Sequence, residues 1–351
     1  MKSQFNPLVY VAMSGGVDSS VAAALLKKGG FNVVGVFMKP WQPEGIACLW
    51  QKDREDALRV ATKLEIPLLT WDFSNEYKAS VTDYMVREYK NGRTPNPDVM
   101  CNKEIKFGLF LKKALAEGAD HIATGHYVRL LRKPFPKMLV AKDKNKDQSY
   151  FLWTLTQKEL KYCLFPIGDY VKPEVRKLAR KFGLPTADKK DSQGVCFVGP
   201  LDIKEFLKKY ISPKNGKVIN ADGETVGDHE GVYYYTIGQR HGLDLGRRDK
   251  EQGTKPYYVT AKDLGSNTIT VGDEKALYTK ETKVSNINWV GENTALPSKV
   301  EVKIRYRTGS EKAILHKNGN LIFERSVRAI TSGQSAVFYK NQEVLGGGVI
   351  V

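Results

Sequence analysis

Short apolar runs alternate with segments of helical periodicity along residues 1–211. Four of the runs have the length of buried strands: residues 8–13, 33–38, 68–71 and 121–124. Between them, apolar side chains recur at helical spacing, as at Ala57, Val60 and Leu64. Strands that alternate with amphipathic helices form βαβ units with a parallel sheet. We therefore expect an α/β domain over residues 1–211.

The pattern changes after residue 211, where helical periods fade and short β-rich runs are separated by turn sequences. Asp222-Gly223 and Asn318-Gly319 are two such turns, and the second joins two alternating runs into a predicted hairpin. We expect a small central β domain over residues 212–275. A C-terminal barrel or sandwich is expected over residues 276–351.

The junction of the first strand and first helix reads Ser14-Gly15-Gly16-Val17-Asp18-Ser19. Backbone N–H groups of a glycine-rich loop and the following helix N-terminus hold phosphate well. The string is neither a Walker A loop nor a G-x-G-x-x-G dinucleotide loop. The alternative is a tight turn in which serine and aspartate only cap the helix.

Charge adds a second expectation, because the 351-residue chain has a formal net charge of +16 and a sequence pI of about 9.4. The basic residues are spread along the chain, which favours a polyanionic partner, although a merely solvated basic surface has the same composition. The sequence starts without a secretory signal and contains no apolar run of membrane-spanning length. We expect a cytoplasmic protein without a membrane partner.

The chain has 4 cysteines and no C-x-x-C pair, which disfavours a zinc site, an iron–sulfur cluster or a disulfide framework. Each could be a small buried hydrophobe, which suits Cys163 best. Cys101 follows a proline-rich segment and opens a predicted helix. With Asp98 as N-cap, it would lie in the first turn, where the helix dipole lowers the pKa of a thiol. Cys196 lies in a polar loop that contains glycine, and such loops often carry function.

These motifs together resemble those of a known family. The S-G-G-x-D-S string is similar to the loop of the ATP pyrophosphatase superfamily, and the whole chain resembles the tRNA-specific 2-thiouridylases. The segments that carry the resemblance occur in this order: residues 12–19, 94–107, 123–127, 146–151, 191–197, 235–240 and 305–307.

The resemblance implies an ATP-pyrophosphatase domain, a small central β domain and a C-terminal β-barrel. It also implies that ATP adenylates the C2 oxygen of the wobble uridine, which sulfur then replaces. The implied ATP site consists of Ala12, Met13, Ser14, Gly15, Gly16, Val17, Asp18, Ser19, Met38 and Gly125. Mg²⁺ bound with ATP is expected near Asp18.

The resemblance further assigns the sulfur chemistry and the RNA contacts. Cys196 would carry a persulfide and Cys101 would release its terminal sulfur, leaving a Cys101–Cys196 disulfide. The segment Asn96-Pro97-Asp98 would meet the target base, with Asp98 as general acid and base. The implied tRNA contacts are Lys146, Asp147, Gln148, Arg305 and Tyr306. The implied partners are tRNA and a desulfurase or relay protein that donates sulfur.

Three alternatives stay open at this stage. A pyrophosphatase-type synthetase acting on a small molecule would need neither the paired cysteines nor the basic surface. A tRNA 4-thiouridine or lysidine enzyme is closer, but no extra N-terminal RNA module is evident and lysidine chemistry does not need Cys196. A non-catalytic RNA-binding protein with a relic nucleotide site would show no ATP turnover.

Overall fold

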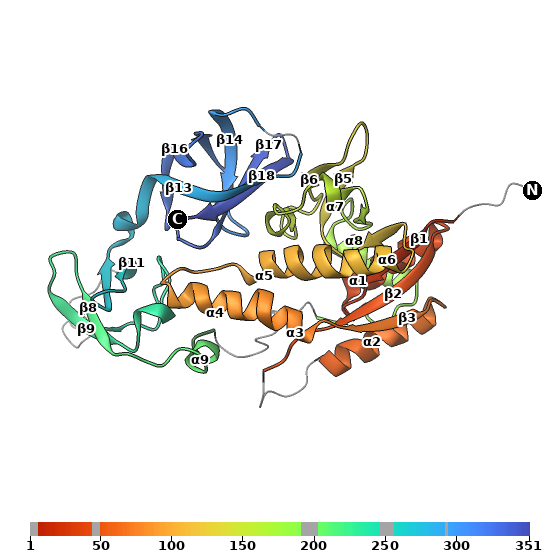
Figure 1. The fold of residues 1–351 in the computed structure, drawn as a ribbon, viewed down its shortest axis with the longest axis horizontal. Helices are drawn as coiled ribbons and strands as arrows, with labels where there is room; N and C mark the ends of the chain where they lie inside the picture. Colours follow the sequence, from red (N-terminus) through yellow and green to blue (C-terminus); the bar gives the residue numbers. More distant parts are fainter. Residues whose placement is uncertain (1–5, 44–49, 191–202, 246–255, 292–293) are drawn as a thin grey trace, which may run out of the picture.

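A computed structural model of the chain describes residues 6–43, 50–190, 203–245, 256–291 and 294–351. Cys48 and the predicted persulfide carrier Cys196 therefore lie outside the described residues. The described strands form three sheets, one in the N-terminal part, one in the middle and one that includes the C-terminal strands (Figure 1).

The N-terminal sheet is parallel and has the strand order β3-β2-β1-β4-β7. Its strands are β1 (Leu8–Ala12), β2 (Asn32–Lys39), β3 (Leu68–Asp72), β4 (His121–Ala123) and β7 (Cys163–Leu164). The four predicted strands are confirmed. The order reverses direction between β1 and β4, and ligands of parallel α/β sheets bind at such a switch point beyond the carboxyl ends of the strands.

Helices cover both faces of this sheet because successive residues of a strand point to opposite sides. Val9 and Val11 pack in the cluster formed with α1 (Val17–Lys28), α2 (Trp50–Lys63) and α8 (Lys172–Lys181). Tyr10 and Ala12 pack in the cluster on the other face.

The helices of the other face form two long rods that run side by side toward the central domain (Figure 1). The first rod consists of α3 (Ser74–Tyr77), the π-helix η1 (Lys78–Thr82) and α4 (Asp83–Lys90). The second consists of α5 (Pro97–Met100), the π-helix η2 (Cys101–Leu109) and α6 (Phe110–Ala116). The remaining described helices of this domain are η3 (Ser149–Phe151), α7 (Gln157–Leu160) and α9 (Ile203–Lys208).

The central sheet has the order β10-β9-β8-β12-β11. Its strands are β8 (Gly216–Ile219), β9 (Thr225–His229), β10 (Asp244–Leu245), β11 (Tyr258–Asp263) and β12 (Thr268–Gly272), and η4 (Val232–Tyr234) follows β9. The predicted Asp222-Gly223 turn joins β8 to β9, with Gly223 at φ +84°.

The C-terminal strands close into a barrel because β13 pairs with both β16 and β18. The strands are β13 (Tyr278–Trp289), β14 (Ser298–Lys303), β15 (Glu311–Leu315), β16 (Asn320–Arg328), β17 (Ser335–Lys340) and β18 (Glu343–Ile350), preceded by η6 (Glu274–Leu277). The barrel and the hairpin at Asn318-Gly319 are confirmed.

One connection crosses between the N-terminal part and the barrel. The hairpin β5 (Val128–Leu131) and β6 (Lys137–Val140) follows β4 in the chain, yet β6 pairs with β18 through Leu139 and Glu343. The barrel is thus fixed to the N-terminal domain by backbone pairing. Among the described residues, no helix is both long and apolar enough to cross a membrane.

Candidate functional site

The predicted phosphate loop lies at the switch point of the parallel sheet. Ala12 ends β1, Val17 begins α1, and Gly15 between them has φ +72°. A Cβ on Gly15 would lie 2.1 Å from the backbone oxygen of Asp53, and a Cβ on Gly125 would lie 2.6 Å from the nitrogen of Ser19. The two glycines therefore let backbone from α2 and β4 approach the loop closely.

Hydrogen bonds inside the loop fix its path. The Ser19 hydroxyl accepts from the N–H of Ser14 at 3.2 Å and contacts the oxygen of Gly16 at 3.2 Å. Met13 donates its N–H to Val36 of β2 at 2.8 Å, and Met38 lies near the carboxyl end of the same strand. The structure thus brings the ten predicted ATP-site residues to one edge of the sheet.

Asp18 is held by two side chains that the sequence analysis missed. The Tyr127 hydroxyl donates to its Oδ1 at 2.8 Å. The ammonium of Lys172 lies 2.8 Å from each carboxylate oxygen, and Lys172 is only 8% exposed. Lys172 begins α8, where a cation opposes the helix dipole. That unfavourable placement is the one feature of the sequence that could have pointed to this lysine.

A second lysine lies behind the loop. Lys189 donates to the backbone oxygen of Gly15 at 3.1 Å, to Asp53 at 2.7 Å and to Asp56 at 2.6 Å. Burial alone lowers the pKa of Lys189, but its hydrogen bonds and charge pairing with the two carboxylates outweigh burial and raise that pKa. Lys189 therefore remains an ammonium group that ties the loop to α2.

The helix that carries Cys101 begins earlier than the sequence indicated. Asn96, not Asp98, is the N-cap, because its side chain accepts from the N–H of Val99 at 3.3 Å and Pro97 occupies the first helical position. The predicted N-cap was wrong because asparagine and aspartate cap helices about equally well. Cys101 therefore lies beyond the first turn, where the effect of the helix dipole has largely decayed.

Cys101 is instead the first residue of the π-helix η2. A Cβ on Gly108 would lie 2.8 Å from the backbone oxygen of Lys103, five residues earlier in the chain. The wide turn thus depends on glycine at this position. Single π-helical turns inside α-helices occur often at functional sites.

Two titratable groups have shifted pKa values here: Asp98, a partly buried residue of α5, and His126, which is buried and packs against Phe107 of η2. Burial raises the pKa of the Asp98 carboxyl above its ordinary value, and the charge of Lys106 opposes the rise in part. Burial also lowers the pKa of His126 well below its ordinary value, and Lys106 adds to that shift. Nδ1 of His126 lies 2.7 Å from the Thr124 hydroxyl. The shift moves the pKa of the Asp98 carboxyl upward, in the direction that favours a general acid and base, whereas His126 stays neutral at neutral pH.

All three domains meet at the segment before this helix. The N–H of Thr94 donates to Ser332 of the barrel at 2.9 Å, and Gln334 donates to the oxygens of Thr94 and Pro95 at 2.9 and 3.2 Å. The Thr94 hydroxyl lies 3.2 Å from that of Thr236 in the central domain. The two residues that precede the predicted target-base segment are therefore held from outside their own domain.

A basic cavity of about 440 Å³ lies between the N-terminal domain and the barrel. Its lining residues are Lys144, Asn145, Lys146, Asp147, Tyr150, Lys303, Tyr306, Arg307, Thr308 and Gly309. The structure brings together three of the five predicted tRNA contacts here. Four cationic side chains and two tyrosine rings around one hollow suit a phosphate backbone and a base.

The predicted tRNA contacts also have contacts within the protein. Asp147 is 5% exposed, and its carboxylate accepts from the N–H of Ala141 at 3.0 Å and from Lys303 at 3.2 Å. Gln148 accepts from the N–H of Tyr127 at 3.0 Å. These two residues thus shape the strand-to-helix connection beside the cavity.

Arg305 is likewise engaged inside the protein. Its guanidinium donates to the oxygens of Ile237 and Ala329 at 3.0 Å and to the Thr331 hydroxyl at 2.8 Å. It therefore joins the barrel to the central domain. A role of Arg305 toward tRNA stays a prediction.

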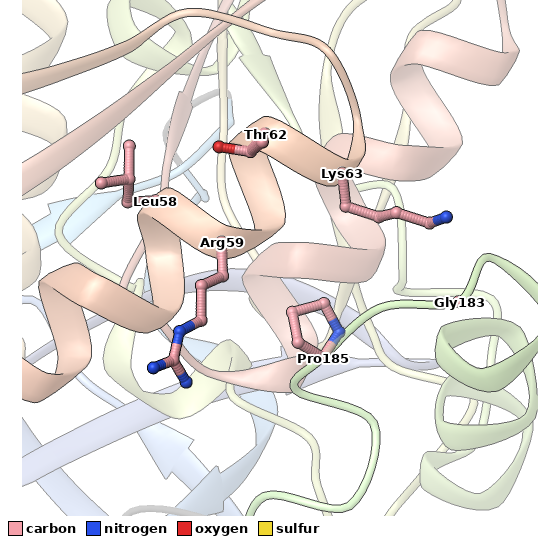
Figure 2. A pocket seen from close by; sticks show the side chains of 6 residues that line it. All are labelled: Leu58, Arg59, Thr62, Lys63, Gly183 and Pro185. Carbon is pink, nitrogen blue, oxygen red and sulfur yellow. The ribbon is translucent and has the colours of Figure 1, made fainter.

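A second cavity, of about 470 Å³, lies between α2 and the segment after α8 (Figure 2). Its lining residues are Leu58, Arg59, Thr62, Lys63, Gly183 and Pro185, and none of them is a predicted site residue. Cys163 is fully buried in β7 and burial raises the pKa of its thiol, as expected for a structural cysteine. In the described part of the chain, no group of three or more His, Cys, Asp or Glu side chains is placed to hold a metal ion.

A parallel sheet with an S-G-G-V-D-S loop at its switch point, followed by a small domain and a barrel, defines an α/β protein of the ATP-pyrophosphatase class. Family models match the chain in three consecutive parts. They are described as tRNA methyl transferase HUP domain (residues 8–200), tRNA methyl transferase PRC-barrel domain (204–273) and aminomethyltransferase beta-barrel domain (279–350).

Curated relatives match nearly the whole chain. The tRNA-specific 2-thiouridylase MnmA 2 of Geobacillus kaustophilus is 45% identical over 99% of this chain and 96% of its own length. The tRNA-specific 2-thiouridylase MnmA of Lacticaseibacillus paracasei is 47% identical over 98% of this chain and 94% of its own length. The chain belongs to the tRNA-specific 2-thiouridylase family.

Proposed function

We propose that this chain is an ATP-dependent tRNA sulfurtransferase that converts the wobble uridine to 2-thiouridine. The observation that carries the proposal is the identity of about 45% to 2-thiouridylases over 99% of the chain. The cavity lined by Lys146, Lys303 and Arg307 supports tRNA as the partner, since it offers clustered positive charge between the N-terminal domain and the barrel.

The first step is activation of the uridine. Its C2 oxygen attacks the α-phosphorus of ATP, the bond to the β-phosphate breaks, and pyrophosphate leaves. Backbone N–H groups from Gly15 to Asp18 and the N-terminus of α1 would hold the phosphates. Bound Mg²⁺ would neutralise phosphate charge, and Asp18 would hold it.

The second step is sulfur transfer. The terminal sulfur of a Cys196 persulfide attacks C2, and the adenylated oxygen leaves as AMP. The Cys101 thiolate then attacks the Cys196 sulfur and releases the transferred sulfur to the base. This leaves a disulfide that an external thiol must reduce. Asp98, whose pKa is raised by burial, would take the uridine N3 proton and return it.

Methyl transfer is the rival that the name of the matching family model raises. A methyl transferase would not need ATP cleavage or a pair of reactive cysteines. The S-G-G-V-D-S loop and the half-buried Cys101 therefore favour thiolation. Nucleoside mass spectrometry separates the two products directly.

The test is incubation of unmodified tRNA with the protein, Mg-ATP and a persulfide donor. We expect 2-thiouridine at the wobble position and equal AMP, with thiolation lost in Cys101→Ser and Cys196→Ser. Cys163→Ala is the matched control, because Cys163 is buried in the sheet. AMP release without any thiolated nucleoside would contradict the proposal, as would a methylated nucleoside in a parallel incubation that also contains a methyl donor.

A further inference from the structure

The segment that follows α8 holds the phosphate loop at two successive peptide groups. The Lys189 ammonium donates to the backbone oxygen of Gly15 at 3.1 Å. The Thr186 hydroxyl donates to that of Ser20 at 3.1 Å, and Ser20 donates in turn to the oxygen of Gly16 at 2.7 Å. Thr186 is 1% exposed and Ser20 is fully buried. Two neighbouring carbonyl groups of the loop are therefore fixed from one short segment.

The direction of a carbonyl group also sets the direction of the next amide. In a trans peptide the C=O and the following N–H point to opposite sides. The contact of the Gly15 oxygen with Lys189 therefore turns the N–H of Gly16 away from Lys189. That N–H points to the hydroxyl of exposed Ser14 at 3.4 Å, which is longer than the usual range of about 2.7–3.2 Å. An incoming phosphate oxygen can replace such a weak contact.

Lys189 is itself held by two helices. Its ammonium donates to Asp53 at 2.7 Å and to Asp56 at 2.6 Å, both on α2. Arg176 of α8 donates to the backbone oxygens of Ala187 and Lys189 at 2.8 and 3.0 Å. The side chain of Lys189 is 26% exposed. Its position beside the loop is thus fixed at both the backbone and the ammonium group.

We propose that Lys189 is a positioning residue that holds the Gly15 carbonyl so that the amide of Gly16 faces the phosphates of ATP. It contacts the loop from the side opposite this amide, so it acts on the nucleotide through the backbone. The inference rests on the proposed function, which makes ATP the ligand of the loop. A loop held in its binding conformation gains affinity because it pays less to become ordered when the ligand binds.

Lys189→Met removes the ammonium group and keeps most of the length of the side chain. Lys27→Met is the matched control. Lys27 donates to the backbone oxygen of Leu64 and to the carboxylate of Glu65, just after α2. Both lysines thus join a backbone oxygen and a carboxylate, but Lys27 lies in the last turn of α1, at the end of the helix away from the loop.

We expect the Kd for Mg-ATP, measured by calorimetry, to rise about 10- to 100-fold in Lys189→Met and to stay within about twofold in Lys27→Met. Loss of Lys189 also leaves two carboxylates beside the loop, and these would repel phosphate. A triple variant, Lys189→Met with Asp53→Asn and Asp56→Asn, removes that repulsion. Its Tm should recover toward wild type, whereas its Kd should stay raised at least about 10-fold because Gly15 still lacks its donor.

A readout without nucleotide separates this inference from the proposed function. Amide hydrogen exchange in a peptide that covers residues 14–20 should be faster in Lys189→Met than in Lys27→Met. Equal exchange in the two variants would overturn the inference, as would wild-type ATP affinity in Lys189→Met or in the triple variant. If the wild-type protein binds no ATP or forms no thiouridine, the proposed function fails, and the exchange rates still decide whether Lys189 fixes the loop.

Discussion

The ammonium group of Lys172 lies 2.8 Å from both carboxylate oxygens of Asp18, although the two residues are 154 positions apart in the sequence. This carboxylate is the one proposed to hold Mg²⁺ with ATP. A metal ion bound there would share the carboxylate with Lys172. An ammonium group so close to the loop can also bind the phosphates of ATP, so we propose that Asp18 and Lys172 together form the phosphate end of the ATP site.

Lys172→Met is accordingly predicted to weaken ATP binding by about 10- to 100-fold, the range expected for loss of one charge-assisted hydrogen bond. Lys172→Arg should retain part of the affinity because it keeps the charge. Calorimetric titration with Mg-ATP or a non-hydrolysable analogue measures the change. Glu174→Gln is the control, because Glu174 lies on the same helix as Lys172 and forms an exposed ion pair with Lys142, which lies before that helix. Unchanged ATP affinity in Lys172→Met would refute the assignment.

Asp98→Asn is predicted to lower thiolation by about 100-fold or more, because it removes the proposed proton carrier. The same change should stabilise the fold at neutral pH. Burial raises the pKa of Asp98 in the folded protein. Between the unfolded and the folded pKa, the folded state therefore binds more protons, and stability falls as pH rises through that window. At a pH above the folded pKa, Asp98 is ionised in both states, and the folded protein bears the full cost of holding the desolvated carboxylate.

Thermal unfolding at several pH values tests the direction of this pH dependence of stability. The Tm of Asp98→Asn should exceed that of wild type at pH 8, and the difference should shrink as pH falls toward the unfolded pKa of about 4. Asp222→Asn, at an exposed turn, should show no such trend. A difference that grows on acidification would mean that Asp98 is stabilised, not penalised, by its surroundings.

The parts that could be predicted are those set by local pattern. The strands before and after the phosphate loop followed from apolar runs, and the hairpin at Asn318-Gly319 followed from turn chemistry. The two-residue strand β7 is too short to leave a pattern. The pairing of Leu139 with Glu343 joins segments that are far apart in sequence.

The candidate site likewise has parts that follow from local sequence and parts that depend on the tertiary fold. The glycines of the loop and the proline-rich approach to Cys101 are local, whereas Lys172 and Lys189 reach the loop only through the tertiary fold. Asn96 and Asp98 are equally good caps by residue type, and only the structure decides between them. Pro97 favours the first helical position, and this local preference agrees with the observed cap.

Gly108→Ala is predicted to disturb the π-helix that begins at Cys101. The added Cβ would lie 2.8 Å from the oxygen of Lys103, so the turn must open further or revert to α-helix. Overpacking of this kind costs about 1–3 kcal/mol. Thiolation should fall more than this stability loss alone explains, because Cys101 moves with the turn. Gly291→Ala, where the added Cβ meets nothing within 4 Å, is the control. Wild-type kcat in Gly108→Ala would show that the π-helix is not required.

The last prediction concerns salt. If the cavity that contains Lys146 and Arg307 holds RNA phosphates, each alanine substitution should weaken tRNA binding. It should also make the plot of log K for tRNA binding against log salt concentration less steep. The magnitude of the slope should fall by about 0.7–0.9 for every phosphate that the missing cation no longer neutralises. Binding titrations between low and moderate salt measure both quantities.

Lys63→Ala is the matched control for that measurement, because Lys63 is a lysine that lines the other cavity (Figure 2). Arg305→Ala provides a second contrast. Its guanidinium donates hydrogen bonds to Ile237, Ala329 and Thr331, which join the barrel to the central domain. The substitution should therefore lower the Tm of the protein. A slope that falls with Lys63→Ala and not with Lys146→Ala would place the RNA on the face of α2. In that case the basic cavity would bind a ligand other than the RNA on which Cys101 is proposed to act.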